Sequence, residues 1–142
     1  ILDLSHELDY TTWMFGKIQI NNVVSKKLSD LKINTDDFLS LSGKTIKSAR
    51  VQMDLNYFTK ENTRRIIIDG KNISIQADLI KKKIVLHEGK KVSILSEPNL
   101  SRNLSYEKLH HSLLKKDFRT CCSFKEGIKI MSMINKIKKL SK

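Results

Sequence analysis

The N-terminal segment of the chain holds a histidine and carboxylates at spacings that suit proton transfer. His6 and Asp9 lie three residues apart and therefore share a helix face, with Asp3 one turn earlier on the same side. A carboxylate beside an imidazole fixes its tautomer and can raise its pKa, which suits acid and base catalysis near neutral pH. The same spacing is typical of a structural helix in which Asp3 is the N-cap and Asp9 a partner. Spacing alone favours this structural interpretation.

The other histidines and the cysteines do not have the spacing of a metal site. His110 and His111 are adjacent, point in different directions on a helix and have no third ligand nearby in sequence. Cys121 and Cys122 are the only cysteines, and a disulfide between neighbours would close a strained ring. We therefore expect no metal centre, and two reduced thiols in a cytoplasmic protein.

The charge balance admits several classes of partner. The chain has 27 Lys and Arg against 15 Asp and Glu, a net charge of +12, which suits nucleic acid, an acidic membrane surface or an anionic substrate. The lysines are scattered, however, and no zinc finger, Arg-rich arm or RNA-binding motif accompanies them. No apolar run approaches the roughly 20 residues that cross a membrane. We expect a solvated basic surface, with no membrane partner and no nucleic acid.

Helical patterns lie at the two ends of the chain. Apolar residues recur at helical spacing over residues 4–15, and Gly16 ends that segment. After Pro98, an amphipathic pattern predicts a helix over residues 106–114. A final helix is expected to begin at Ser123, because Ser123 and Glu126 have the spacing of a capping box.

The segments between these helices predict an antiparallel sheet. The expected strands are residues 18–24, 38–41, 51–57, 66–68, 73–79, 84–86 and 92–95. Alternation of apolar and polar residues is strictest over residues 51–57. Asp69-Gly70 and the turn around Gly89 are hairpin signals, and such short connections require antiparallel neighbours. The sequence therefore predicts one α+β domain over residues 1–142, with helices on one face of an open, mostly antiparallel sheet of about six strands.

Several motifs have the order and spacing of a known protein family. The matching residues are Leu4 to Tyr10, Trp13, Phe15 and Gly16; Ser29, Leu31, Ile33 and Asp37; Arg65 to Ile68 and Gly70; Tyr106; and Cys122, Ser123, Gly127 and Met131. This set resembles the C-terminal domain of the Gfo/Idh/MocA oxidoreductases, named for glucose–fructose oxidoreductase and inositol dehydrogenase. The opening motif is fairly specific, and the matches run the whole length of the chain.

The resemblance implies a two-domain enzyme in which this α+β domain supplies substrate contacts and the oligomer interface. His6 matches the family's catalytic histidine, which works with a lysine of the other domain. The family usually places an acid four residues before that histidine, where this chain has Leu2, so Asp3 is expected to be either catalytic or a helix cap. Asp9 and Tyr10 are expected to contact the substrate.

A second basic candidate lies at the entry of a predicted strand. Arg65 can bind an anionic substrate through two parallel hydrogen bonds, and it can equally form a cross-strand ion pair. Both interpretations stay open from the sequence.

The family's other domain is a Rossmann domain that binds NAD or NADP, and we expect it to be absent from this chain. No Gly-x-Gly-x-x-Gly occurs, and the five glycines are widely dispersed. The chain alone is therefore expected to bind no cofactor and to be inactive. The expected function is the catalytic and substrate-binding half of an NAD(P)-dependent dehydrogenase that acts on a CH–OH group of a sugar, sugar derivative or nucleotide sugar.

The sequence also leaves an alternative function open and predicts an assembly. The alternative is a basic, non-catalytic module that binds nucleic acid or a protein partner. In either case, apolar residues interrupt the polar face of the predicted sheet, and large open apolar patches are rare on monomers. We therefore expect a homo-oligomer through the sheet face. The interrupting residues are Phe58, Ile67, Ile80, Val85 and Leu95.

Overall fold

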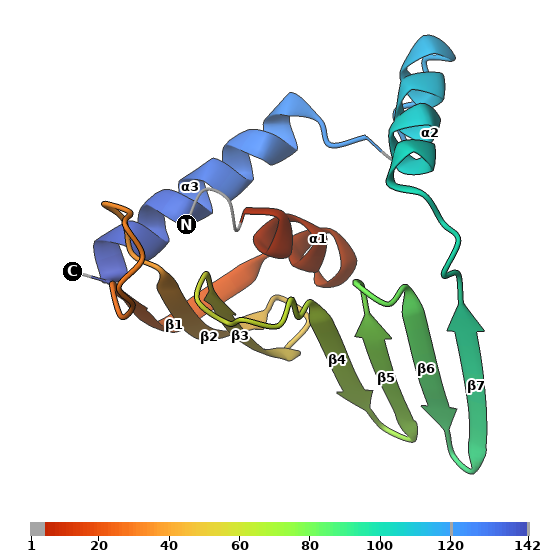
Figure 1. The fold of residues 1–142 in the computed structure, drawn as a ribbon, viewed down its shortest axis with the longest axis horizontal. Helices are drawn as coiled ribbons and strands as arrows, with labels where there is room; N and C mark the ends of the chain where they lie inside the picture. The colour runs from red at the N-terminus through yellow and green to blue at the C-terminus, as the bar shows by residue number, and fades with distance from the viewer. Residues whose placement is uncertain (1–4, 120, 142) are drawn as a thin grey trace. The chain divides into compact units, whose positions relative to one another are not determined.

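The computed structural model describes residues 5–119 and 121–141, and these fold as two compact units (Figure 1). Unit 1 comprises the described residues up to Phe58 together with those from Cys122 onward, and unit 2 comprises the residues between them. The predicted α+β class and antiparallel arrangement are confirmed. No helix in the described part of the chain is long and apolar enough to cross a membrane.

Unit 1 is a three-stranded sheet with two helices on one face (Figure 1). Its elements are α1 (Ser5–Phe15), β1 (Ile18–Lys26), β2 (Phe38–Thr45), β3 (Arg50–Asn56) and α3 (Phe124–Leu140). The strands pair antiparallel in the order β1-β2-β3. Within this unit the helices lie on one face of the sheet, as the sequence predicts.

The core of unit 1 forms between that sheet face and the helices. Alternate strand residues point inward, and Leu39 and Leu41 are each 1% exposed. From α3, an apolar stripe at helical spacing contributes four buried side chains. The buried apolar residues are Leu8, Ile18, Ile20, Leu39, Leu41, Met53, Ile130, Met133, Ile134 and Ile137.

The capping box predicted at the start of α3 is confirmed. The Ser123 hydroxyl accepts a hydrogen bond from the backbone N–H of Glu126 at 3.3 Å, and the Glu126 carboxylate accepts one from the backbone N–H of Ser123 at 2.8 Å. Two otherwise unpaired N–H groups are thereby satisfied, which stabilises a helix by about 1 kcal/mol.

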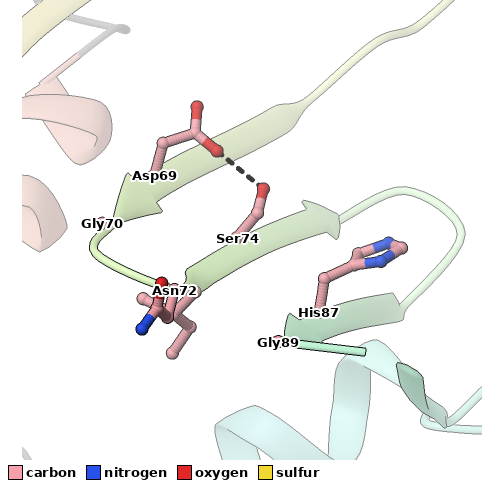
Figure 2. A pocket seen from close by; sticks show the side chains of 7 residues that line it. Asp69, Gly70, Asn72, Ser74, His87 and Gly89 are labelled. Carbon is pink, nitrogen blue, oxygen red and sulfur yellow. Dashed lines mark hydrogen bonds between the residues drawn. The ribbon is translucent and has the colours of Figure 1, made fainter. Parts of the chain in front are cut away.

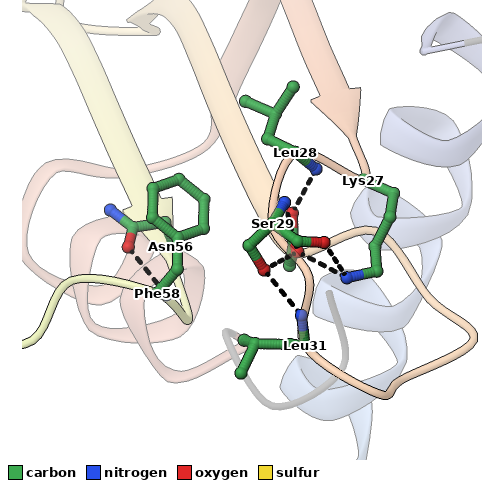
Figure 3. A network of polar contacts seen from close by, with 7 residues as sticks. Lys27, Leu28, Ser29, Leu31, Asn56 and Phe58 are labelled. Atoms are coloured by element: carbon green, nitrogen blue, oxygen red, sulfur yellow. Dashed lines mark hydrogen bonds and ion pairs between the residues drawn. The ribbon is translucent and has the colours of Figure 1, made fainter.

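A buried carboxylate, Asp37, holds the loop between β1 and β2. Figure 3 shows its partners Lys27, Leu28 and Ser29 in this loop. Its oxygens accept hydrogen bonds from the backbone N–H groups of Leu28 at 2.6 Å and Ser29 at 3.0 Å, and from the Ser29 hydroxyl. The Lys27 ammonium completes the shell at 2.9 Å. Burial by itself raises the pKa of Asp37, but these bonds together hold the pKa well below its usual value.

Unit 2 is a four-stranded antiparallel meander followed by one helix. Its strands are β4 (Arg65–Gly70), β5 (Ile73–Asp78), β6 (Lys83–Glu88) and β7 (Lys91–Ser96), paired in chain order. The hairpin predicted at Asp69-Gly70 joins β4 to β5, with its turn at residues 71–72 directly after Gly70, and Gly89 lies in the turn between β6 and β7. Helix α2 (Arg102–Leu114) begins four residues before the predicted start, because the Ser101 hydroxyl caps it by accepting from the N–H of Leu104 at 3.0 Å.

The seven strands match the expected positions, but they are hydrogen-bonded in two sheets of three and four strands. The predicted single sheet is corrected here, because residues 57–64 between β3 and β4 form no ladder. This segment is polar and turn-rich. It is too long for a tight hairpin turn, and it lacks the alternating pattern of a strand.

Candidate active site

Helix α1 carries the candidate catalytic residues, and its end is fixed by a glycine. Leu8 is buried and fastens the helix to the core of unit 1. The backbone N–H of Gly16 donates to the carbonyl of Thr12 at 2.8 Å, and Gly16 has a φ of 83°. A side chain at Gly16 would be strained at this φ and would press against Ile46. The chain therefore turns sharply from α1 into β1.

Four polar or aromatic side chains lie in one row on the outer face of α1. His6, Asp9, Tyr10 and Trp13 occupy positions i, i+3, i+4 and i+7, which share a helix face. His6 is exposed, Asp9 and Tyr10 are half-buried, and Trp13 is 73% exposed. The structure thus places His6, Asp9 and Tyr10 together, as their spacing predicts. We call this row the α1 face.

The start of α3 lies close to this face and adds a thiol that the sequence pattern does not single out. Partial burial raises the pKa of the Cys122 thiol, and the nearby carboxylates of Asp9 and Glu126 raise it further. The thiol also donates to the carbonyl oxygen of Ser123 at 3.6 Å. Cys122 therefore stays protonated near neutral pH and is a poor nucleophile. His6 is the better candidate for proton transfer.

Cys122 lies beside Asp9 because α1 packs against α3, and 113 residues separate the two positions in the sequence. The only signal for this neighbourhood is the match of Cys122-Ser123 to the family motif. Asp3 lies outside the described residues, so its role as catalyst or helix cap stays a prediction.

Arg65 belongs to unit 2 and forms the cross-strand ion pair that its position allows. Its Nε lies 3.6 Å from Oδ2 of Asp78, which is its register partner on β5. The N–H of Lys81 is the main cause of the lowered pKa of Asp78, and the charge of Arg65 contributes. The Arg65 side chain is 58% exposed, so the pair is a weak one. A substrate contact by Arg65 stays a prediction.

The hairpin end of unit 2 has a shallow, open depression of ≈ 380 Å³ (Figure 2). Asp69, Ser74 and His87 lie side by side on β4, β5 and β6. The Ser74 hydroxyl donates to Asp69 at 2.6 Å, and Figure 2 shows the His87 ring turned away from this pair. The hydroxyl therefore bonds the carboxylate rather than the imidazole, so the three groups do not form a nucleophilic triad.

The described residues offer no ligand set for a metal ion or a dinucleotide. No group of three His, Cys, Asp or Glu side chains among residues 5–119 and 121–141 could hold a metal ion. A dinucleotide needs a parallel strand followed by a glycine-rich loop and a helix, whereas every strand pair in the described ranges is antiparallel. The Glu126 carboxylate also occupies the N-terminus of α3 and repels phosphate. The described residues therefore do not fit NAD or NADP.

Comparison with known proteins identifies the fold. No family model and no curated protein matches the sequence. Among solved structures, UDP-N-acetylglucosamine 3-dehydrogenase GnnA from Acidithiobacillus ferrooxidans has a TM-score of 0.75 at 10% identity, over 94% of this chain and 44% of its own. An oxidoreductase from Thermotoga maritima has a TM-score of 0.71 at 20% identity, over 96% of this chain and 40% of its own.

A third solved structure is named for a regulatory role. The super-repressor mutant of Gal80p from Saccharomyces cerevisiae has a TM-score of 0.69 at 11% identity, over 98% of this chain and 46% of its own. The chain thus spans less than half the length of each of the three. Its fold is similar to part of a protein named as a dehydrogenase, part of one named as an oxidoreductase and part of a repressor. All three neighbours are Gfo/Idh/MocA proteins, so the resemblance predicted from the sequence is confirmed in the fold.

Proposed function

We propose that this chain is the catalytic and substrate-binding part of an NAD(P)-dependent oxidoreductase that acts on a CH–OH group of a sugar-type substrate. The observation that carries the proposal is the exposed His6, which shares a face of helix α1 with Asp9 in a fold similar to that of two oxidoreductases. The match of His6 to the catalytic histidine of the family supports it. GnnA is named for a UDP-linked sugar, so sugars, sugar derivatives and nucleotide sugars are the substrates to examine.

In the proposed reaction, this chain binds the substrate and moves a proton. His6 takes the proton of the reacting hydroxyl as the carbinol carbon is oxidised, and it returns that proton in the reverse direction. Asp9 orients the imidazole, and the Tyr10 hydroxyl contacts the substrate beside it. Arg65 is a candidate contact for an anionic substrate. The hydride acceptor is held by residues outside those described here.

Replacement of His6 in the complete two-domain enzyme tests this function. In His6→Ala, we expect turnover to fall by about 100-fold or more, the usual scale for loss of a general acid or base, with cofactor affinity unchanged. His87→Ala is the matched control, because His87 is exposed and lies in unit 2. Equal turnover in the two variants would contradict the proposal.

We also propose that the chain forms a two-fold dimer through the sheet of unit 2. The strand register places a continuous set of apolar side chains on one face, and all remain at least partly exposed within the described residues. They are Ile66, Ile68, Ile75, Ala77, Ile84, Leu86 and Leu95. The opposite face mixes Ile67, Val85 and Ile94 with charged and polar residues. A second copy of this face is a matching partner, since two-fold interfaces are self-complementary.

The register also corrects the interface expected from the sequence. The sequence pattern assigns Ile67 and Leu95 to one face, but Ile67 aligns with Val85 and Ile94, whereas Leu95 aligns with Ile66 and Ile84 on the other face. Side chains alternate along a strand, so the pairing register decides the face.

A non-catalytic protein-binding module is the second candidate. The similarity to the Gal80p super-repressor supports it, because a protein named for repression has the same fold. The two candidates differ at His6. A binding module keeps its partner affinity in His6→Ala, whereas the enzyme loses turnover.

A further inference from the structure

Three large apolar side chains are exposed at one end of unit 1, where α1 ends and β2 turns into β3. Trp13 and Met14 belong to the last turn of α1, and Ile46 lies in the turn between β2 and β3. Their exposed fractions are 73%, 40% and 64%. We call these three residues the apolar end. Exposed apolar groups of this kind are costly in water, and together they mark an interaction site.

Contacts between the two segments hold the apolar end in place. The backbone N–H of Ile46 donates to the carbonyl of Lys17 at 3.1 Å. The Ile46 side chain lies against Gly16, where an added Cβ would be 3.3 Å from Cγ1 of Ile46. Within the turn, the buried Thr45 hydroxyl accepts from the N–H of Lys47 at 3.2 Å. A surface that is fixed before binding loses little conformational freedom in a complex.

Two lysines adjoin the apolar end, and the surrounding segments contain no carboxylate. Lys17 lies two residues beyond α1, Lys47 follows Ile46 in the turn, and both lysines are exposed. Residues 10–29 and 38–53, which include the end of α1 and both sides of the turn, contain no Asp or Glu. These segments therefore contribute only positive charge around the apolar end, which favours an anionic partner.

We infer that the apolar end is a docking site for an acidic segment of a partner protein. Apolar side chains of the partner pack on the apolar end, and its carboxylates lie beside the two lysines. Trp is enriched among the residues that dominate protein–protein binding energies, and opposite charges at the rim steer the partner into place. This site adds a partner to the proposed function and does not depend on the reaction at His6.

Other occupants fit this site less well. A second copy of the same surface would bring lysines against lysines, and like charges across an interface are costly. A nucleic-acid backbone would bind the lysines but leave the three apolar side chains exposed to water. An acidic segment with apolar side chains satisfies both features of the surface.

Binding of synthetic peptides to the 142-residue chain tests this inference. The probe is a short peptide in which Asp and Glu alternate with Leu and Phe. One control peptide has Ser in place of Leu and Phe, and the other has Asn and Gln in place of Asp and Glu. Trp13 is the only tryptophan of the chain, so its fluorescence reports on the site, and calorimetry gives the affinity.

We expect the probe to bind at least ~10-fold more tightly than either control peptide and to shift the Trp13 emission to shorter wavelength. The shift follows because the bound partner removes the indole from water. Equal binding of the three peptides, or no binding of the probe, would overturn the inference.

Charge-reversal variants separate the two lysines from the general surface charge. Lys17→Glu/Lys47→Glu should weaken binding of the probe by ~10-fold or more, because two exposed attractions become repulsions. Lys44→Glu/Arg50→Glu is the matched control: it changes the net charge equally, but these side chains lie on the sheet face away from α1. At physiological salt, where charges more than ~8 Å apart are largely screened, the control should bind the probe nearly as well as the wild type. Equal losses in the two variants would contradict the docking site.

The complete two-domain enzyme must leave the apolar end open to a partner. Acrylamide quenching of Trp13, taken as the difference between the wild type and Trp13→Phe, measures its accessibility there. We expect ready quenching in the enzyme alone and protection when the probe is added. Protection in the enzyme alone would show that the enzyme covers this surface itself, and a Trp13 emission shift with phosphatidylglycerol vesicles would assign the surface to a membrane. Either result would overturn the inference.

Discussion

The Ser29 hydroxyl donates a 2.5 Å hydrogen bond to Oδ2 of Asp37, eight positions further along the same loop. The same carboxylate accepts two backbone N–H groups and the Lys27 ammonium, and it is fully buried. In turn, the backbone carbonyl of Asp37 accepts from the N–H of Tyr57 at 3.0 Å, just beyond β3. One residue therefore ties the start of β2 to the loop that follows β1.

Replacement of Asp37 should destabilise unit 1. In Asp37→Asn, one carboxylate oxygen becomes an NH₂ group that faces donors, so buried hydrogen bonds are lost. We expect the melting midpoint to fall by more than ~5 °C, the scale of a loss of this kind in a small domain. Thermal unfolding followed by circular dichroism measures it. Asp30→Asn is the control, because Asp30 is exposed in the same loop; an equal fall in both variants would contradict this role.

Asp37 should also make the stability depend on pH in the acid range. Its pKa is lower in the folded protein than the ordinary value of 3.8, so the unfolded chain binds the proton first. The stabilisation is fully present above about pH 4 and is lost as the pH falls toward the folded pKa. We expect the wild type to lose more stability than Asp37→Asn between about pH 4 and pH 2. Urea unfolding at several pH values measures this difference, and parallel curves for the two proteins would refute it.

The Cys122 thiol should report on its contact with α1. The carboxylates of Asp9 and Glu126 help to keep its pKa high, so removal of one charge increases the thiolate fraction. We expect Asp9→Asn to speed alkylation of Cys122 about two- to threefold at pH 8, because the thiolate is the reacting form. Iodoacetamide labelling followed by mass spectrometry measures the rate at each cysteine. Asp54→Asn, on the outer face of the sheet in unit 1, should leave the rate unchanged.

Local patterns in the sequence predict the elements of this fold well. Alternating apolar residues such as Val51, Met53 and Leu55 identify a strand because side chains alternate between the two faces of a sheet. The capping box of α3 needs only the Ser123–Glu126 spacing. The outer row of α1 follows from helical geometry alone, so the spacing of His6 and Asp9 is enough to predict that they share a face.

Long-range relationships could not be predicted in the same way. The proximity of Cys122 to Asp9 depends on how α1 packs against α3, and no local pattern encodes helix packing. The family resemblance includes Ser29 and Asp37 only as matching positions. The hydrogen bonds of Asp37 could not be predicted, because a loop carboxylate that accepts several N–H groups has no fixed sequence periodicity. The separation into two sheets depends on residues 57–64, which form no strand ladder.

The assembly prediction follows from the register of the sheet in unit 2. Leu95 is 58% exposed on the apolar face with Ile66 and Ile84, and its neighbour Ile94 is 62% exposed on the opposite face. A lysine on the apolar face would place a charge in the proposed dimer interface, where unpaired charges are costly. Light scattering at tens of micromolar should give twice the 16.4 kDa chain mass for the wild type and for Ile94→Lys, and a single chain mass for Leu95→Lys. A monomeric wild type would reject the dimer, and a dimeric Leu95→Lys would reject this face of the sheet as its interface.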